Sequence, residues 1–297
     1  MCVVMLGGCS RLLYYPSDQY LHPADFKKAK LQPPEEVLFS SWDSTPLYGW
    51  YFKNKTRKIP RGLIVFFHGN ASNISGHFPA LYWILNQGYD YFIFDYEGYG
   101  KSQGKPSPRA TINDGKAALC WAALHHPSVP LIVFGQSLGG AVALRTVSEV
   151  KDRIPIAYLA VDSTFSSYRA AARGVLAHHW LTWILQPIVY AVISDRYAPK
   201  GHIAEISPIP LLVLHGDQDQ TVDFKLGKKV YELAKPPKEF IRVVGGRHID
   251  AFWGHEGWYR REFIKQLNRI TQNRVAISQM YSMERIRSYC ELSKGHP

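Results

Sequence analysis

Short runs of apolar residues recur through the middle of the chain, and each run ends at a glycine or a polar residue. Nearly continuous apolar runs of this length are typical of strands that a parallel sheet buries on both faces. They predict strands at 63–67, 91–94, 131–134, 158–161, 211–214 and 240–244. Segments long enough for helices lie between most of them, for instance 79–87, 111–124 and 222–234. This alternation predicts an α/β fold, with a mostly parallel central sheet flanked by helices.

The carboxyl edge of this sheet is where we expect the chemistry, because reactive groups in open α/β sheets collect just beyond the strand ends. Polar residues follow the predicted strands there, among them His68, Asp95 and Asp162. Two earlier runs, 37–40 and 47–52, predict antiparallel strands that extend the sheet.

Composition and charge restrict the class of protein. With 297 residues, 46% of them hydrophobic and 20% charged, the chain is long and apolar enough to fold without staples. Lys and Arg outnumber Asp and Glu by 35 to 24, a net charge of +11 that suits lipid headgroups or nucleic acid. No recognition motif supports nucleic-acid binding, so we expect no such partner. The four cysteines have no zinc-site spacing, so we expect no metal and no disulfide framework.

One motif predicts a nucleophile. Gly135-Gln136-Ser137-Leu138-Gly139 matches G-x-S-x-G, follows an apolar strand and precedes a helix-compatible run. That is the context of a nucleophile elbow, in which Ser137 Oγ is exposed at a strained turn between strand and helix. The motif alone is only moderately specific for a nucleophile. Its placement between a strand and a helix is the stronger support for this assignment.

A serine hydroxyl is a weak nucleophile, so it needs a base and an acid that orients the base. His248, after the run at 240–244, is the predicted base. Asp219, after the run at 211–214, is the predicted orienting acid, and Asp217 is its rival. Asp223 is instead expected to cap the helix that follows. The order Ser, Asp, His is the order found in α/β-hydrolases.

Acyl transfer also needs hydrogen-bond donors for the developing oxyanion. The backbone N–H of Leu138, directly after the nucleophile, is one expected donor. The other is expected from the loop after the strand at 63–67, and we assign it to the backbone N–H of Asn70.

Four segments together resemble the α/β-hydrolase superfamily: 68–71, 95–102, 135–139 and 215–219 with His248. Within it the chain is most similar to bacterial α/β-hydrolase lipoproteins of the serine aminopeptidase and lysophospholipase-like group. The resemblance implies a hydrolase domain at 35–270 with a small helical cap inserted at about 164–207. Its H-G-x-x-D pattern favours Asp219 over Asp217. It further implies a serine hydrolase that cleaves lipid-like or acyl esters without a cofactor.

Other functions remain open at this point. The same triad serves serine peptidases and acyltransferases. A non-catalytic binding protein of the cell envelope is a further alternative, although a scaffold has no need to keep Ser, Asp and His together.

The first residues raise a question of targeting. Leu6-Gly7-Gly8-Cys9 resembles the bacterial lipobox, which implies lipidation of Cys9 and a membrane-anchored protein of the cell envelope. Only eight residues precede Cys9 and none is basic, so either the true start lies upstream or the match is accidental. In the second case the segment is a short apolar terminus of a cytoplasmic protein. We expect 10–34 to be a tether, whose lysines could add a basic patch for membrane association.

Two further segments are less informative. The run 175–193 is nearly apolar, but its histidines, Gln186 and Pro187 favour a cap helix pair over a membrane span. Trp180, Trp183, Leu185 and Ile188 there are predicted to line a substrate pocket, with ordinary surface packing as the alternative. The tail 271–297 is expected to be either a packed helix or a mobile end.

Overall fold

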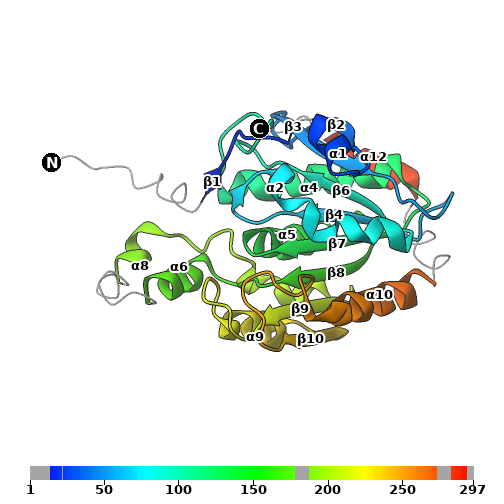
Figure 1. Cartoon of the computed structure of the whole chain (residues 1–297). Coiled ribbons are helices and arrows are strands. Elements are labelled where there is room, and N and C mark those ends of the chain that lie inside the picture. Colours follow the sequence, from blue (N-terminus) through cyan, green and yellow to red (C-terminus); the bar gives the residue numbers. More distant parts are fainter. Residues whose placement is uncertain (1–13, 22, 178–186, 273–281, 293–297) are drawn as a thin grey trace.

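The computed structural model describes residues 14–21, 23–177, 187–272 and 282–292. Its centre is an eight-stranded sheet in the order β10-β9-β8-β7-β4-β6-β3-β2 (Figure 1). The α/β fold class is therefore as predicted. The parallel strands are β4 (Leu63–Phe67), β6 (Asp90–Phe94), β7 (Leu131–Gln136), β8 (Ile156–Asp162), β9 (Leu211–Gly216) and β10 (Lys238–Val243). The antiparallel strands are β2 (Glu35–Ser40) and β3 (Pro46–Phe52).

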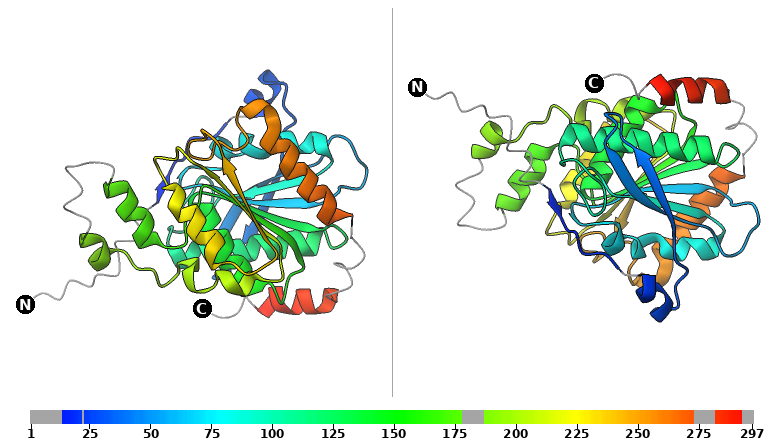
Figure 2. Two further views of the ribbon diagram at one scale, coloured as in Figure 1. Left: turned by 90° about the horizontal axis from the view of Figure 1, so that it is seen from below. Right: turned by 90° about the horizontal axis from the view of Figure 1, so that it is seen from above.

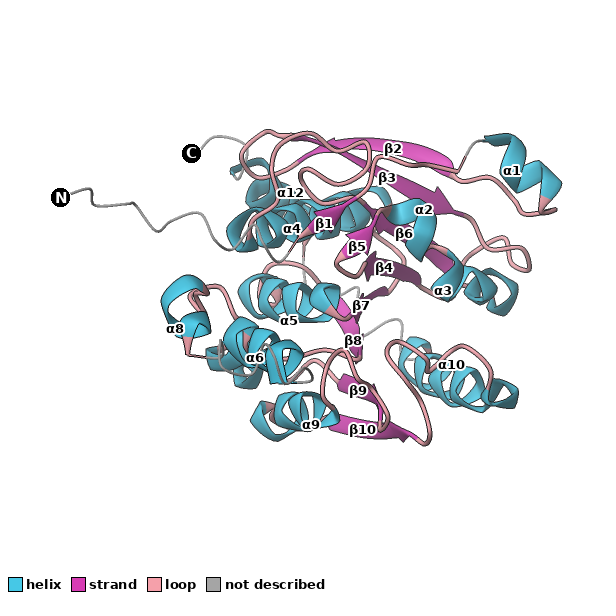
Figure 3. Ribbon diagram, turned by 60° about the vertical axis from the view of Figure 1, so that its left-hand side comes forward, coloured by secondary structure: helices cyan, strands magenta, loops and turns pink. Residues whose placement is uncertain are grey.

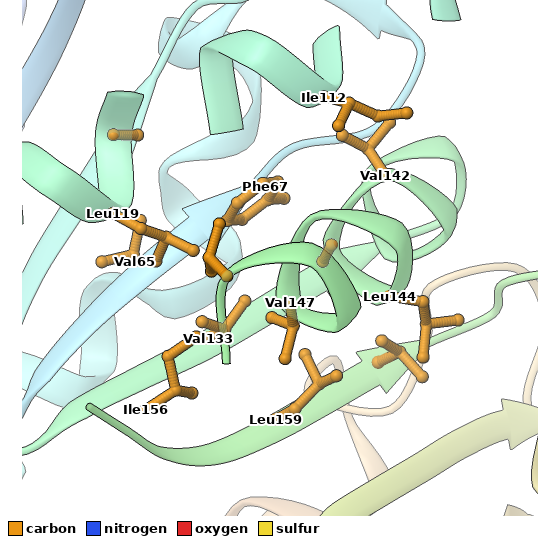
Figure 4. Close-up of a cluster of buried hydrophobic side chains, with 14 of the residues drawn as sticks. Val65, Phe67, Ile112, Leu119, Val133, Val142, Leu144, Val147, Ile156 and Leu159 are labelled. Carbon is orange, nitrogen blue, oxygen red and sulfur yellow. The ribbon is translucent and has the colours of Figure 1, made fainter. Parts of the chain in front are cut away.

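The structure has a strand at each of the six runs predicted for the parallel sheet. Along β4, Leu63 and Val65 belong to the core on one face, whereas Ile64 and Phe66 belong to the core on the other. Figure 4 shows the first of these cores, where side chains of the sheet meet those of two helices. A strand in which apolar and polar residues alternate would have apolar side chains on one face only.

Helices cover both faces of the sheet (Figure 2). The first core is closed by α4 (Pro108–His125), α5 (Leu138–Val150) and α9 (Phe224–Leu233). The second is closed by α2 (Ile74–His77), α3 (Pro79–Tyr82), the 3₁₀ turn Trp83–Gln87 and α10 (Trp258–Thr271). The predicted helix at 79–87 is thus two short pieces.

The start of the described chain forms a two-residue strand and a short helix. Strand β1 (Tyr15–Pro16) pairs in parallel with β5 (Ala71–Ser72), directly after the end of β4 (Figure 3). Helix α1 (Pro23–Lys28) follows. Tyr14 and Phe26 are buried in the two cores. This part of 10–34 is therefore anchored on the domain at Tyr14 and Phe26, two buried aromatic side chains that the proline-rich, aperiodic sequence does not reveal.

Helices α6 (Tyr168–Ala177) and α8 (Ile188–Val192) project at the same end of the molecule as β1 (Figures 1 and 2). Pro187 stands at the N-cap of α8. Two 3₁₀ turns, Pro199–Gly201 and Ile203–Ile206, lead back to β9. Among the described residues, no helix is both long and apolar enough to cross a bilayer.

The C-terminal part corrects one expectation about the cysteines. After the 3₁₀ turn His255–Gly257 and α10, helix α12 (Met283–Leu292) packs on α4 and buries Ile286. Cys290 of α12 forms a disulfide with Cys120 of α4, across a separation of 170 residues. Sequence spacing carries no sign of such a pair, because tertiary packing alone brings the two helices together.

Candidate active site

The turn between β7 and α5 has the geometry of a nucleophile elbow. Ser137 lies between the two elements with φ 53° and ψ −120°, a positive φ that a residue with a Cβ seldom adopts. The turn is also crowded: a Cβ at Gly139 would lie 2.1 Å from the carbonyl oxygen of Phe67. One at Gly135 would lie 2.7 Å from the carbonyl oxygen of Gly139. Both glycines are therefore required by the close approach of strand and helix.

The structure brings Ser137, His248 and Asp219 together, although they lie on three separate loops. Ser137 follows β7 and Asp219 follows β9. His248 follows β10, the outermost strand of the sheet, which lies next to β9. His248 Nε2 lies 3.0 Å from Ser137 Oγ, and His248 Nδ1 lies 2.8 Å from Asp219 Oδ2. Both distances are within hydrogen-bond range.

Asp219 is buried and surrounded by donors. Its Oδ1 accepts hydrogen bonds from the backbone N–H groups of Thr221 at 2.8 Å and Val222 at 2.9 Å. Its Oδ2 also lies 3.3 Å from His215 Nε2. Burial alone would raise the pKa of Asp219, but the hydrogen bonds with His215 and His248 outweigh it and hold that pKa well below its usual value. Asp219 is therefore ionised at neutral pH.

The charge of Asp219 determines how His248 is protonated. An ionised carboxylate can only accept hydrogen bonds, so the neutral imidazole carries its hydrogen on Nδ1. Nε2 is then left with a free lone pair directed at the Ser137 hydroxyl, 3.0 Å away. This is the arrangement in which an imidazole can remove the hydroxyl proton.

Two hydroxyl groups after β8, which no sequence motif indicates, support the site. Ser163 Oγ accepts a hydrogen bond from the backbone N–H of Ile249 at 2.9 Å, which fixes the loop that carries His248. Thr164 Oγ1 donates to the carbonyl oxygen of Ser137 at 2.7 Å. In the sequence, only their position directly after the strand that ends at Asp162 points to these residues. Serine and threonine are common after strands, so this position does not predict a role in the site.

The two segments that carry the predicted oxyanion donors both adjoin Ser137. Leu138 is the first residue of α5, where backbone N–H groups have no partner within the helix. Asn70 follows Gly69, and a Cβ placed on Gly69 would lie 3.8 Å from Ser137 Cβ. The loop after β4 therefore passes directly beside Ser137.

The remaining polar candidates have structural contacts. Asp217, the rival acid, pairs with Arg242 at 2.7 Å and accepts a hydrogen bond from the backbone of Gly245, away from His248. Asp223 caps α9 by accepting from the Lys225 N–H, as predicted. His68 is fully buried, and burial holds its pKa well below the usual value. It is therefore a neutral packing residue.

Several predicted positions lie outside the described residues, namely Cys9, Trp180, Trp183 and Leu185. Ile188, the fourth predicted pocket residue, begins α8 with 54% of its surface exposed. The pocket therefore stays a prediction. In the described part of the chain, no group of three His, Cys, Asp or Glu side chains is arranged to hold a metal ion.

Comparisons with known proteins agree with this geometry. The profile of the family described as serine aminopeptidase, S33, matches residues 58–197. The uncharacterized protein YfhR of Escherichia coli K12 is 35% identical over 267 residues, which cover 88% of each chain. Lysophosphatidylserine lipase ABHD12 of Macaca fascicularis is 32% identical over 76% of this chain and 60% of its own length. The esterase Pf2001 of Pyrococcus furiosus superposes with a TM-score of 0.65 and 25% identity, covering 86% of this chain and 97% of that one.

Proposed function

Because this chain belongs to the α/β-hydrolase superfamily, we propose that it is a serine hydrolase that cleaves carboxylic esters of lipid-like or acyl substrates. One observation carries the proposal: His248 lies within hydrogen-bond distance of both Ser137 Oγ and Asp219 Oδ2. The names of two similar proteins, a lysophosphatidylserine lipase and an esterase, support an ester substrate.

The mechanism follows from the placement of each group. His248 Nε2 takes the proton from Ser137 as Oγ attacks the ester carbonyl, and ionised Asp219 stabilises the imidazolium that forms. The backbone N–H groups of Leu138 and Asn70 bind the oxyanion of the tetrahedral intermediate. His248 then gives the proton to the leaving alcohol, which produces an acyl-enzyme on Ser137. Water, activated by the same imidazole, releases the carboxylic acid and restores the serine.

The proposal is tested by covalent labelling and turnover together. A fluorophosphonate probe should label the protein at Ser137, and Ser137→Ala should abolish both the label and ester hydrolysis. The expected loss in kcat is about 10⁶-fold, because replacement of a nucleophile leaves only binding and oxyanion stabilisation. Ser148→Ala is the matched control, since Ser148 bonds the carbonyl of Arg145 on helix α5. Hydrolysis that survives Ser137→Ala would exclude the assignment.

A peptidase is the second candidate, and the description of the matching family as serine aminopeptidase favours it. The same groups would attack an amide, with His248 protonating the leaving amine. A panel of acyl esters of graded chain length, aminoacyl amides and alcohol acceptors separates the activities. Higher kcat/KM on esters supports the proposed function, preference for aminoacyl amides supports the peptidase, and transfer to the alcohol supports an acyltransferase.

We further propose that the protein acts outside the cytoplasm, anchored through Cys9 and assisted by its basic surface. The Cys120–Cys290 disulfide supports this proposal, because disulfides persist in oxidising compartments and are rare in the cytosol of mesophiles. Mass spectrometry of the mature N-terminus tests the anchor: a lipid on Cys9 supports it, and an unmodified chain that includes Met1 contradicts it.

A further inference from the structure

The loop after β4 that carries Asn70 is called the oxyanion loop below. The side chain of Asn70 links this loop to two other parts of the molecule. Its Oδ1 accepts a hydrogen bond from the backbone N–H of Tyr15 at 3.1 Å. The same oxygen accepts a second hydrogen bond from the hydroxyl of Tyr99 at 3.0 Å. Neither bond uses the backbone N–H of Asn70, the group to which the mechanism assigns the oxyanion.

The first of these parts is a segment that we call the N-terminal strap, residues 14–20. It runs along the oxyanion loop through the parallel pairing of β1 with β5. The N–H of Ser17 donates to the carbonyl of Ser72 at 3.2 Å. Asn73 Nδ2 donates to the carbonyls of Ser17 and Gln19, each at 2.7 Å. The strap is thus bonded to the chain on the C-terminal side of Asn70 as well as to Asn70 itself.

The second part is a group of aromatic rings beneath the loop. Tyr14 is 5% exposed and meets Tyr99 edge to face, with ring centroids 6.4 Å apart. Tyr99 in turn contacts the ring of His68, with centroids 5.3 Å apart. Tyr96 donates its hydroxyl hydrogen to the carbonyl of His68 at 3.2 Å. The strap therefore also supplies a buried ring that holds Tyr99 in place.

We propose that the N-terminal strap and Tyr99 are positioning elements that hold the Asn70 side chain and thereby aim its backbone N–H at the oxyanion. This inference rests on the proposed hydrolase function. An oxyanion donor stabilises the transition state only within a narrow range of distance from the oxyanion. A small displacement of the loop therefore reduces binding of the transition state more than binding of the substrate. The strap is thus part of the active site, although it is remote in sequence from the G-x-S-x-G motif.

The test compares two tyrosine hydroxyls of the same kind. Tyr99→Phe removes the bond to Asn70 Oδ1 and keeps the ring. Tyr89→Phe is the matched control, because Tyr89 donates its hydroxyl to Asn268 Oδ1 at 3.0 Å, between β6 and α10. We expect Tyr99→Phe to lower kcat about 10- to 100-fold while KM changes less than about threefold. Tyr89→Phe should leave both constants unchanged, with a similar small decrease in melting temperature.

Asn70→Ala completes a double-mutant cycle. The variant keeps the backbone N–H but loses the anchor, so kcat should fall at least as far as in Tyr99→Phe. Adding Tyr99→Phe to Asn70→Ala should cause little further loss, because both changes break the same bond. Losses that multiply, or a decrease in kcat confined to Asn70→Ala, would instead assign the Asn70 side chain a direct contact with substrate and overturn the positioning role.

The strap is tested through the backbone N–H of Tyr15, which donates to Asn70 Oδ1. Tyr15→Pro removes the N–H that bonds Oδ1, whereas Tyr15→Ala keeps it, and the side chain that both remove is 64% exposed. We expect kcat of the proline variant to be about tenfold below that of the alanine variant, and equal values would overturn the role of the strap. These outcomes are distinct from failure of the proposed function, in which the wild-type chain itself would neither react with the probe nor hydrolyse esters.

Discussion

Gly139 lies where helix α5 crosses the carboxyl end of β4, and this contact leaves no room for a side chain. A Cβ there would lie 2.1 Å and 2.2 Å from the carbonyl oxygens of Phe67 and His68. Gly139→Ala should therefore lower the free energy of unfolding by about 2–3 kcal/mol, because the backbone at the elbow must shift. Urea denaturation measures the change.

Gly174 provides the control for this substitution. It lies within α6, and a Cβ there would meet no atom within 4 Å. Gly174→Ala should leave stability unchanged or increase it by up to about 1 kcal/mol, since alanine is the better helix former. Equal effects of the two alanines would contradict the steric argument.

Substitution of each of the two aspartates after β9 tests which of them orients His248. Asp219→Asn should lower kcat about 10³- to 10⁴-fold, because a neutral amide no longer fixes the tautomer of His248 or stabilises its charged form. Asp217→Asn should leave kcat near the wild-type value, because Asp217 pairs with Arg242 instead. Steady-state kinetics on one ester decide, and a larger loss for Asp217→Asn would reverse the assignment.

Among the elements, those buried on both faces were the predictable ones. The run at 63–67 has apolar residues at every position, and glycine and polar residues follow it directly, which is typical of a short strand buried on both faces of a parallel sheet. The strap has no such pattern: Tyr14 is buried and Tyr15 is exposed, but a strand of two residues, Tyr15–Pro16, has no periodicity to detect. Its structure depends on contacts with residues more than 50 positions away, which only the folded chain shows.

Helix α12 is joined to the domain by a covalent bond as well as by packing. The Cys120–Cys290 bond closes a long loop, so it restricts the unfolded chain more than the folded one. Cys290→Ser should lower the free energy of unfolding by about 2–5 kcal/mol. Urea denaturation with and without reductant measures this effect: reductant should destabilise the wild type but leave Cys290→Ser unchanged. Equal sensitivity of both proteins would show that α12 is held by packing alone.

At the scale of the whole molecule, the candidate site was predictable because its parts follow strands. Ser137, Asp219 and His248 each lie just beyond the end of a strand, and neighbouring parallel strands bring such positions to one edge. The supporting contacts were not predictable. Ser163 and the side chain of Asn70 bond to backbone N–H groups 86 and 55 residues away, and no residue type specifies such partners.

Buried Asp95 makes the stability of the whole fold depend on pH. Burial raises its pKa to about 7, whereas an unfolded chain releases this proton near pH 4. Between these values the folded protein holds more protons than the unfolded one, so stability contributed by Asp95 declines as pH rises from about 4 to about 7. Asp95→Asn should flatten the decline by up to about 1.4 kcal/mol per pH unit. Urea denaturation from pH 5 to pH 8 measures both proteins, and parallel curves would refute the prediction.

The strap has a consequence for where the molecule finds its substrate. Tyr14 is fixed beside the oxyanion loop, and Cys9 stands only five residues before it. Even fully stretched, that length of chain reaches at most about 18 Å. An acyl group on Cys9 would consequently keep the loop that carries Asn70 close to the headgroup layer, which shortens the distance that an ester from the bilayer must diffuse through bulk water.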